Sequence, residues 1–142
     1  MKTTLAGILA GAGMLWAVAP VSAHHAFAAE FDATKPIKLQ GTVKRMEWIN
    51  PHAWIHIDVK GQDGKVVTWM IEAGPPNSLL RRGFSRNSLM PGTEILVDGY
   101  RAKGGGNRAN GTDLTFLDGR RLFLGSSGTG APSDERDPKL NR

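Results

Sequence analysis

The sequence contains no cysteine, so it can form no disulfide and offers no thiolate as a nucleophile or as a metal ligand. It also lacks the short signatures of two hydrolase classes, Gly-x-Ser-x-Gly and His-Glu-x-x-His. After the N-terminal region no second long apolar run follows, which argues against a spanning helix in the rest of the chain. These absences favour a non-enzymatic domain that depends on its core and its backbone pairing.

The N-terminus has the three parts of a secretory signal peptide. Lys2 supplies a positive start, an apolar stretch follows over Leu5–Val18, and Val21–Ala23 offers small residues for cleavage. A membrane anchor is the alternative, but a spanning helix needs about 20 apolar residues and this stretch is shorter. We therefore expect residues 1–23 to be removed. The mature chain would begin at His24, in the periplasm or secreted, without stable membrane insertion.

The charge is mildly basic, with a formal net value of +5 that falls by one when Lys2 leaves with the signal peptide. Such an excess favours acidic partners or surfaces. In an exported protein we do not expect nucleic acid to be that partner. A small ligand, a metal ion or an exported protein remains as the expected partner.

Strict alternation after Pro51 predicts a strand with one buried face. One side would carry Ala53, Ile55, Ile57 and Val59, and the other would carry His52, Trp54, His56 and Asp58. We expect Ile55 and Ile57 in the core, with His52 and His56 together on the opposite face.

The order of the expected elements is three strands, one short helix, and two or three further strands. The strands cover roughly 41–59 (with a bend at 49–51), 66–72, 94–102, 112–117 and 121–124, and the helix covers 79–82, capped within Pro75–Ser78 and anchored by Leu79, Leu80 and Phe84. This is the order of an OB-fold. We predict an all-β fold with one short helix, a small OB-fold-like barrel of five to six strands; another small sandwich or barrel is the alternative.

The chain divides into four expected segments. They are a cleavable signal peptide at 1–23, an N-terminal arm at 24–40, the barrel domain at 41–124 and a disordered tail at 125–142. Phe27 and Phe31 would tie the arm to the barrel.

Several segments carry a family resemblance when they are taken together. They are His24–Asp32, Gly41–Val43, Trp48–His52, Leu80–Gly83 and Pro91–Gly92. With them the chain resembles an uncharacterised family of exported bacterial proteins, filed as domain of unknown function 6152, to about Phe123. The resemblance implies a periplasmic, OB-like β-domain. It implies no activity, so function has to be argued from the residues.

The expected terminal histidine is the sharpest candidate for chemistry. His24 would present its α-amine, with a pKa near ~7.7, and its ring nitrogen to one metal ion. A further imidazole would complete a three-nitrogen site that suits copper(II) and resembles the histidine brace of exported copper proteins. His25 is adjacent and His52 follows the bend at Pro51, whereas His52 and His56 are about 13 Å apart along a strand and cannot share an ion. The predicted metal residues are His24, His25 and His52; incidental histidines on a solvent face are the alternative.

A ligand surface is the second candidate. OB-folds bind ligands on a strand face and its adjoining loops, so Trp54 and His56 are expected ligand-binding residues. Trp54 would stack on a sugar or another planar ligand, unless it packs beneath the arm. Arg81 and Arg82 would add an anion-binding surface, for which solvated charges are the alternative.

We therefore predict a non-enzymatic, exported binding domain that holds copper or another small ligand near the mature N-terminus. Two alternatives stay open. One is an accessory domain that binds an exported or membrane protein partner, and the other is a small copper-dependent enzyme.

Overall fold

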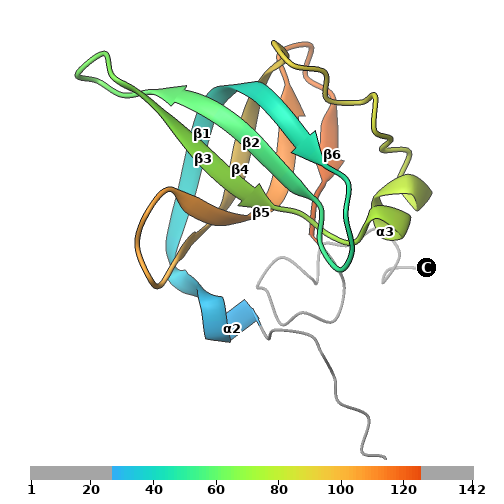
Figure 1. Ribbon diagram of the computed structural model, residues 1–142, viewed down its shortest axis with the longest axis horizontal. Helices are drawn as coiled ribbons and strands as arrows, with labels where there is room; N and C mark the ends of the chain where they lie inside the picture. The colour runs from blue at the N-terminus through green and yellow to red at the C-terminus, as the bar shows by residue number, and fades with distance from the viewer. Residues whose placement is uncertain (1–26, 126–142) are drawn as a thin grey trace, which may run out of the picture.

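The structure is a computed structural model that describes residues 27–125. Its elements are α2 (Phe27–Glu30), β1 (Phe31–Glu47), β2 (Trp54–Lys60), β3 (Val66–Glu72), α3 (Pro76–Arg81), β4 (Glu94–Ala102), β5 (Arg108–Phe116) and β6 (Arg121–Phe123), shown in Figure 1. The predicted all-β fold is confirmed. Where the chain was expected to be an irregular arm, α2 forms a single turn of helix.

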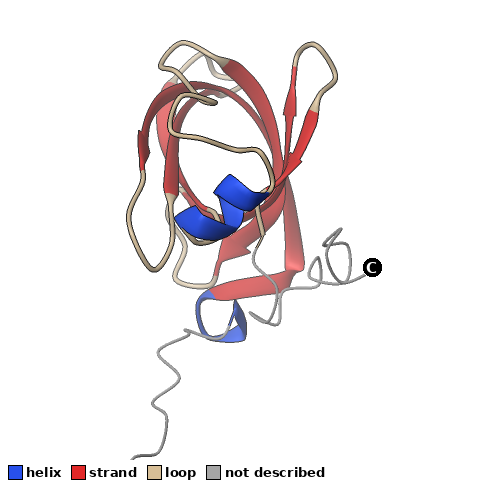
Figure 2. Cartoon of the chain, turned by 90° about the vertical axis from the view of Figure 1, so that its right-hand side faces the viewer, coloured by secondary structure: helices blue, strands red, loops and turns tan. Residues whose placement is uncertain are grey.

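The strands form one sheet that closes on itself. The sheet order is β3-β2-β1-β4-β5-β6 with antiparallel neighbours, and β5 also pairs in parallel with β3. This seam pairs Met70 with Arg108 and Glu72 with Asn110, so β1 to β5 make a ring. Figure 2 shows that ring, with α3 lying across one end of it. A five-stranded ring with a helix between β3 and β4 is the predicted OB-like barrel, and β6 extends the sheet beyond β5.

Ile55 and Ile57 of β2 are buried as predicted, and so is Ala53 just before the strand. All three have 0% exposure, because alternate side chains of every strand in the ring meet inside it. Leu79 of α3 and Phe84 beyond it join the same core. Burial of this apolar surface is the main favourable term in folding.

Two strands begin earlier than expected, β1 at a register shift and β5 in a run of small residues. β1 begins at Phe31 rather than near Gly41, and Pro36–Thr42 pairs with β4. The pairing shifts register between Phe31 and Pro36, so no simple alternation marks this part of the strand. β5 begins at Arg108 rather than at Thr112, through small residues of low strand propensity.

The short helix also differs from the expectation at its start. α3 begins at Pro76, and no side chain caps it. Proline suits this first turn because the backbone N–H groups there have no partner within the helix. Leu80 was expected as an anchor but is exposed, because a helix of six residues presents only one side to the barrel.

Phe27 and Phe31 are buried and tie α2 to the barrel as expected. The ring of Phe27 meets that of Tyr100 edge-on, with centroids 5.4 Å apart. No helix within residues 27–125 has the length and apolar character needed to cross a membrane. The expected signal peptide, His24, His25 and the tail after Gly125 lie outside the described residues.

Candidate functional site

Two glutamates flank Trp54 on the outer face of β2. Glu47 of β1 and Glu72 of β3 are its partners across the two strand pairings. Directly opposed residues of antiparallel strands share a face, so these three side chains lie side by side. Backbone hydrogen bonds of Ala53 with Gly74 and Ala73 continue the pairing past Trp54, which brings His52 to the end of β3.

His52 forms a nearly buried pair with Glu72. Its Nδ1 lies 3.0 Å from Oε1 of Glu72, and the two side chains are 13% and 10% exposed. The hydrogen bond to Glu72 raises the pKa of His52, with a further contribution from the charges of Glu72 and Glu30, while burial opposes the shift. In this contact Nδ1–H of His52 donates to the carboxylate of Glu72, which leaves Nε2 as the ring atom that can bind a metal ion.

Arg108 links this pair to the N-terminal helix. Its guanidinium donates to Oε2 of Glu30 at 2.7 Å and lies 3.7 Å from Oε2 of Glu72. The same guanidinium stands over the ring of Trp54, 4.7 Å from its centroid. We call His52, Glu72, Arg108 and Glu30 the His52 network. One face of the Trp54 ring is therefore covered by an arginine.

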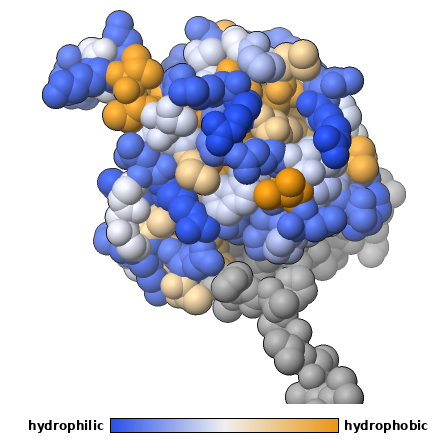
Figure 3. All heavy atoms as spheres, in the orientation of Figure 1, coloured by the Kyte–Doolittle hydropathy of each residue, from blue (hydrophilic) through white to orange (hydrophobic). Residues whose placement is uncertain are grey.

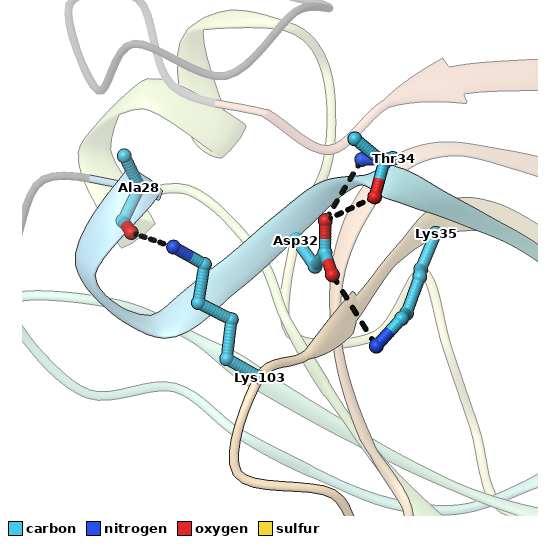
Figure 4. A network of polar contacts seen from close by, with 5 residues as sticks. All are labelled: Ala28, Asp32, Thr34, Lys35 and Lys103. Carbon is cyan, nitrogen blue, oxygen red and sulfur yellow. Dashed lines mark hydrogen bonds and ion pairs between the residues drawn. The ribbon is translucent and has the colours of Figure 1, made fainter.

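The loop between β4 and β5 borders the His52 network and is fastened to α2. Lys103 donates to the carbonyl of Ala28 at 2.7 Å, and Figure 4 shows this contact beside the turn that Asp32 makes with Thr34. A cavity of about 400 Å³ lies between this loop and α2, with Glu30 and Arg108 in its wall. Lys103 and Arg108 are thus both committed to protein groups.

His56 lies on the same face of β2 but belongs to a second, separate pair. It is buried, and its Nε2 lies 2.9 Å from Oε1 of Glu47. The distance is short, but the two groups are not aligned for a hydrogen bond. A hydrogen bond from Arg45 lowers the pKa of Glu47, and the charge of His56 acts in the same direction. The two histidines thus face glutamates on opposite neighbouring strands, and His56 offers little surface to a ligand.

Arg81 and Arg82 serve α3 and the end of the barrel. Arg81 donates to Oγ of Ser78 at 3.2 Å. Arg82 donates to the carbonyl of Gly125 at 2.7 Å and stands over the ring of Phe123. The structure does not bring either arginine into the His52 network.

The raised pKa of His52 predicts a pH-dependent stability. A histidine whose pKa is higher in the folded state stabilises that state fully below the unfolded pKa of about 6.5, and this contribution is lost as pH rises through the folded pKa. We expect His52→Gln to cost more free energy of unfolding at about pH 5.5 than at about pH 9. Urea unfolding of both proteins at the two pH values measures this difference. Equal costs would contradict the assigned pair, because the other histidines are common to both proteins.

The glutamates and Arg108 could not be selected from the sequence as site residues. Glu47 and Glu72 are 25 positions apart, and only the three-strand register places both beside Trp54. Arg108 approaches Glu72 because β5 pairs with β3 from Arg108 onward. The predicted strand began only at Thr112 and therefore did not include this pairing. The usable signal was the position of Glu72, at the last residue of a predicted strand.

Within residues 27–125, no group of three or more His, Cys, Asp or Glu side chains could hold a metal ion. His24 and His25 fall outside this range, so a metal site that used them is not described. Comparison with protein families gives a match over residues 13–112 to a family of unknown function, DUF6152. No curated protein matches the chain.

Proposed function

The chain belongs to DUF6152, a family whose description assigns no function, and from the geometry of the His52 network we propose that it is an exported, non-enzymatic domain that binds copper(II). His52 would supply an imidazole to the ion, and His24 at the mature N-terminus would supply the α-amine and a second imidazole. His25 is the alternative donor of the additional ring.

The contact between His52 and Glu72 carries this proposal. A histidine that ligates a metal almost always gives its other ring N–H to a carboxylate or carbonyl, which fixes the tautomer and the ring orientation. Nδ1 of His52 lies 3.0 Å from Glu72 in this way. The ring of His52 is thus oriented before any metal binds, with Nε2 as the nitrogen that can coordinate the ion.

The length of chain between His24 and α2 supports this ligand set. His24 is three positions before Phe27, and three such steps span at most about 11 Å when the chain is fully extended. Phe27 is buried against the barrel, and Glu30 of the same helix contacts Arg108 of the network. With α2 anchored in this way, a mature terminus at His24 would start within about 11 Å of Phe27, on the helix that contacts the His52 network.

Two buried polar atoms on the same side of β5 are left for a water or another hydrogen-bonding group beside the proposed site. Nε of Arg108 and Oδ1 of Asn110 are buried and have no hydrogen-bond partner among the described residues. Buried polar groups are nearly always paired, so such atoms mark places where a ligand or a water belongs. Both lie at the seam with β3, where Asn110 pairs with Glu72.

Removing the charge of Glu72 tests the proposal. We expect Glu72→Gln to weaken copper(II) binding by about 10–100-fold, the usual effect of losing an outer-shell partner. The protein is prepared with His24 as its first residue and titrated with copper(II) by calorimetry. The matched control is Glu47→Gln, which changes the carboxylate next to His56 and should leave the affinity unchanged. Equal losses in the two variants would contradict a site built on His52.

A further inference from the structure

The hairpin of β2 and β3 extends beyond the strands that flank it. β1 pairs with β2 only as far as Asp58, and β5 pairs with β3 only from Met70 onward. Figure 1 shows the hairpin standing out from the barrel. Among residues 27–125, no strand pairs with the outer edge of Val66–Trp69, on the side away from β2. We call these four residues the open edge.

The open edge is apolar and has little of the protection that such edges usually carry. Val66 is 61% exposed, and Val67 and Met70 are exposed as well. Figure 3 shows an apolar patch on the projecting hairpin. Edge strands are normally blunted by prolines, bulges or charges. The open edge contains no proline and no charged residue, and β3 pairs with β2 without a register shift. The charges nearest to it along the chain are Lys65, just before β3, and Glu72, at the far end of the strand.

The backbone of the open edge is oriented to accept a further strand. Met70 donates its N–H to the carbonyl of Asn107 at 2.9 Å, on the side away from β2. Alternate residues of a strand direct their N–H and C=O groups to the same side. Val66 and Thr68 therefore direct theirs outward at the open edge, where an incoming strand would form two pairs of hydrogen bonds.

Two cations without an ion pair to any described residue flank the open edge. Lys60 pairs with Val66 across the hairpin, and the guanidinium of Arg101 stands 5.5 Å from the ring centroid of Trp69. The other nearby cations are paired, Lys44 with Asp58 and Lys65 with Asp63, each at 3.7 Å. Positive charge at both ends of the edge favours a partner with carboxylates.

We propose that the open edge is a docking site for an extended acidic segment of an exported partner protein, which adds to β3 as a further strand. Strand addition takes its affinity from main-chain hydrogen bonds and its specificity from alternate side chains. A second copy of the chain is a poorer occupant, because pairing two such edges brings Lys60 and Arg101 of both copies together. This inference does not depend on copper binding.

Two peptides test the charge and the position of the proposed site. One is an octapeptide of alternating valine and glutamate, and its counterpart alternates valine and lysine. We expect the glutamate peptide to bind at least about tenfold more tightly at low salt, with amide shifts centred on Val66–Trp69 in nitrogen-15 spectra. The double variant Lys60→Glu with Arg101→Glu should reverse this preference. Equal binding of the two peptides, or shifts elsewhere, would overturn the proposal.

A backbone variant tests strand addition itself. Thr68→Pro removes one outward N–H without removing a donor to β2, and proline is tolerated at edge positions of this kind. Thr68→Val is the control, since it also loses the hydroxyl that contacts Asp58 but keeps the N–H. Peptide binding should persist in the valine variant and be lost in the proline variant. Should the proline variant not fold, the charge-reversal result decides. Concentration-dependent broadening at Val66–Trp69 without peptide would assign the edge to a second copy and overturn the proposal.

Discussion

Adding one glycine before His24 is expected to lower the copper(II) affinity of the mature protein by more than the roughly 10–100-fold that an outer-shell change causes. The extension moves the free α-amine one residue away from the His24 ring, so the amine and the imidazole no longer chelate one ion from the same residue. Every imidazole remains in place. The comparison therefore separates a terminal chelate from general binding by histidines, and calorimetry on the two proteins measures it.

The controls for this experiment follow from the proposed ligand set. His52→Gln should reduce affinity in the native-length protein, and electron paramagnetic resonance should then report fewer coordinated nitrogens. If the extended and native forms bind copper equally, the terminal chelate is wrong. If neither binds more tightly than an unstructured peptide of the same terminal sequence, the copper proposal fails, and a domain that binds protein partners becomes the better explanation.

Ile57→Ala is expected to destabilise the fold by about 2–5 kcal/mol, the usual cost of truncating a buried large aliphatic side chain. Ile57 has 0% exposure, and its strand is paired on both sides, with Val43 of β1 and Trp69 of β3. The surrounding strands cannot collapse into the space without breaking their registers. Denaturant unfolding followed by circular dichroism measures the loss.

Leu117→Ala is the matched control for Ile57→Ala. Leu117 lies in the turn between β5 and β6 and is 69% exposed, so truncation there should change stability by no more than about 0.5 kcal/mol. The outcome that contradicts the assigned core is an equal, small effect of both substitutions.

Much of the barrel could be predicted because its signals are local. The alternation from Ala53 to Val59 marks one strand, and turn residues separate it from the next. The first half of β1 and the start of β5 gave no such signal. Gly111 explains the second case. A Cβ at that position would come within 2.7 Å of Ile71, so packing across the barrel requires a residue that strand propensities disfavour.

The candidate site was less predictable because it depends on contacts between distant segments. His52 could be selected for its place after Pro51, and Trp54 for its place on the alternating strand. Their partners could not, because the pairing of Trp54 with Glu72 and the approach of Arg108 exist only once the sheet has its register. His56 was predicted on the outer face of its strand, and that position alone did not show that its side chain would be buried there.

The parallel seam between β3 and β5 has a consequence for the order in which the chain folds. Met70 and Arg108 are almost 40 positions apart, whereas the hairpin partners Asp58 and Thr68 are ten apart. Closing a long loop loses more chain entropy than closing a short one, and this entropy is lost before the contacts that compensate for it have formed. The β2–β3 hairpin can therefore form early, while the seam must wait until β4 and β5 have been placed. His52 and Glu72 belong to the β2–β3 pairing, whereas Arg108 reaches them only across the seam, so we expect the His52 network to be completed after the hairpin has formed.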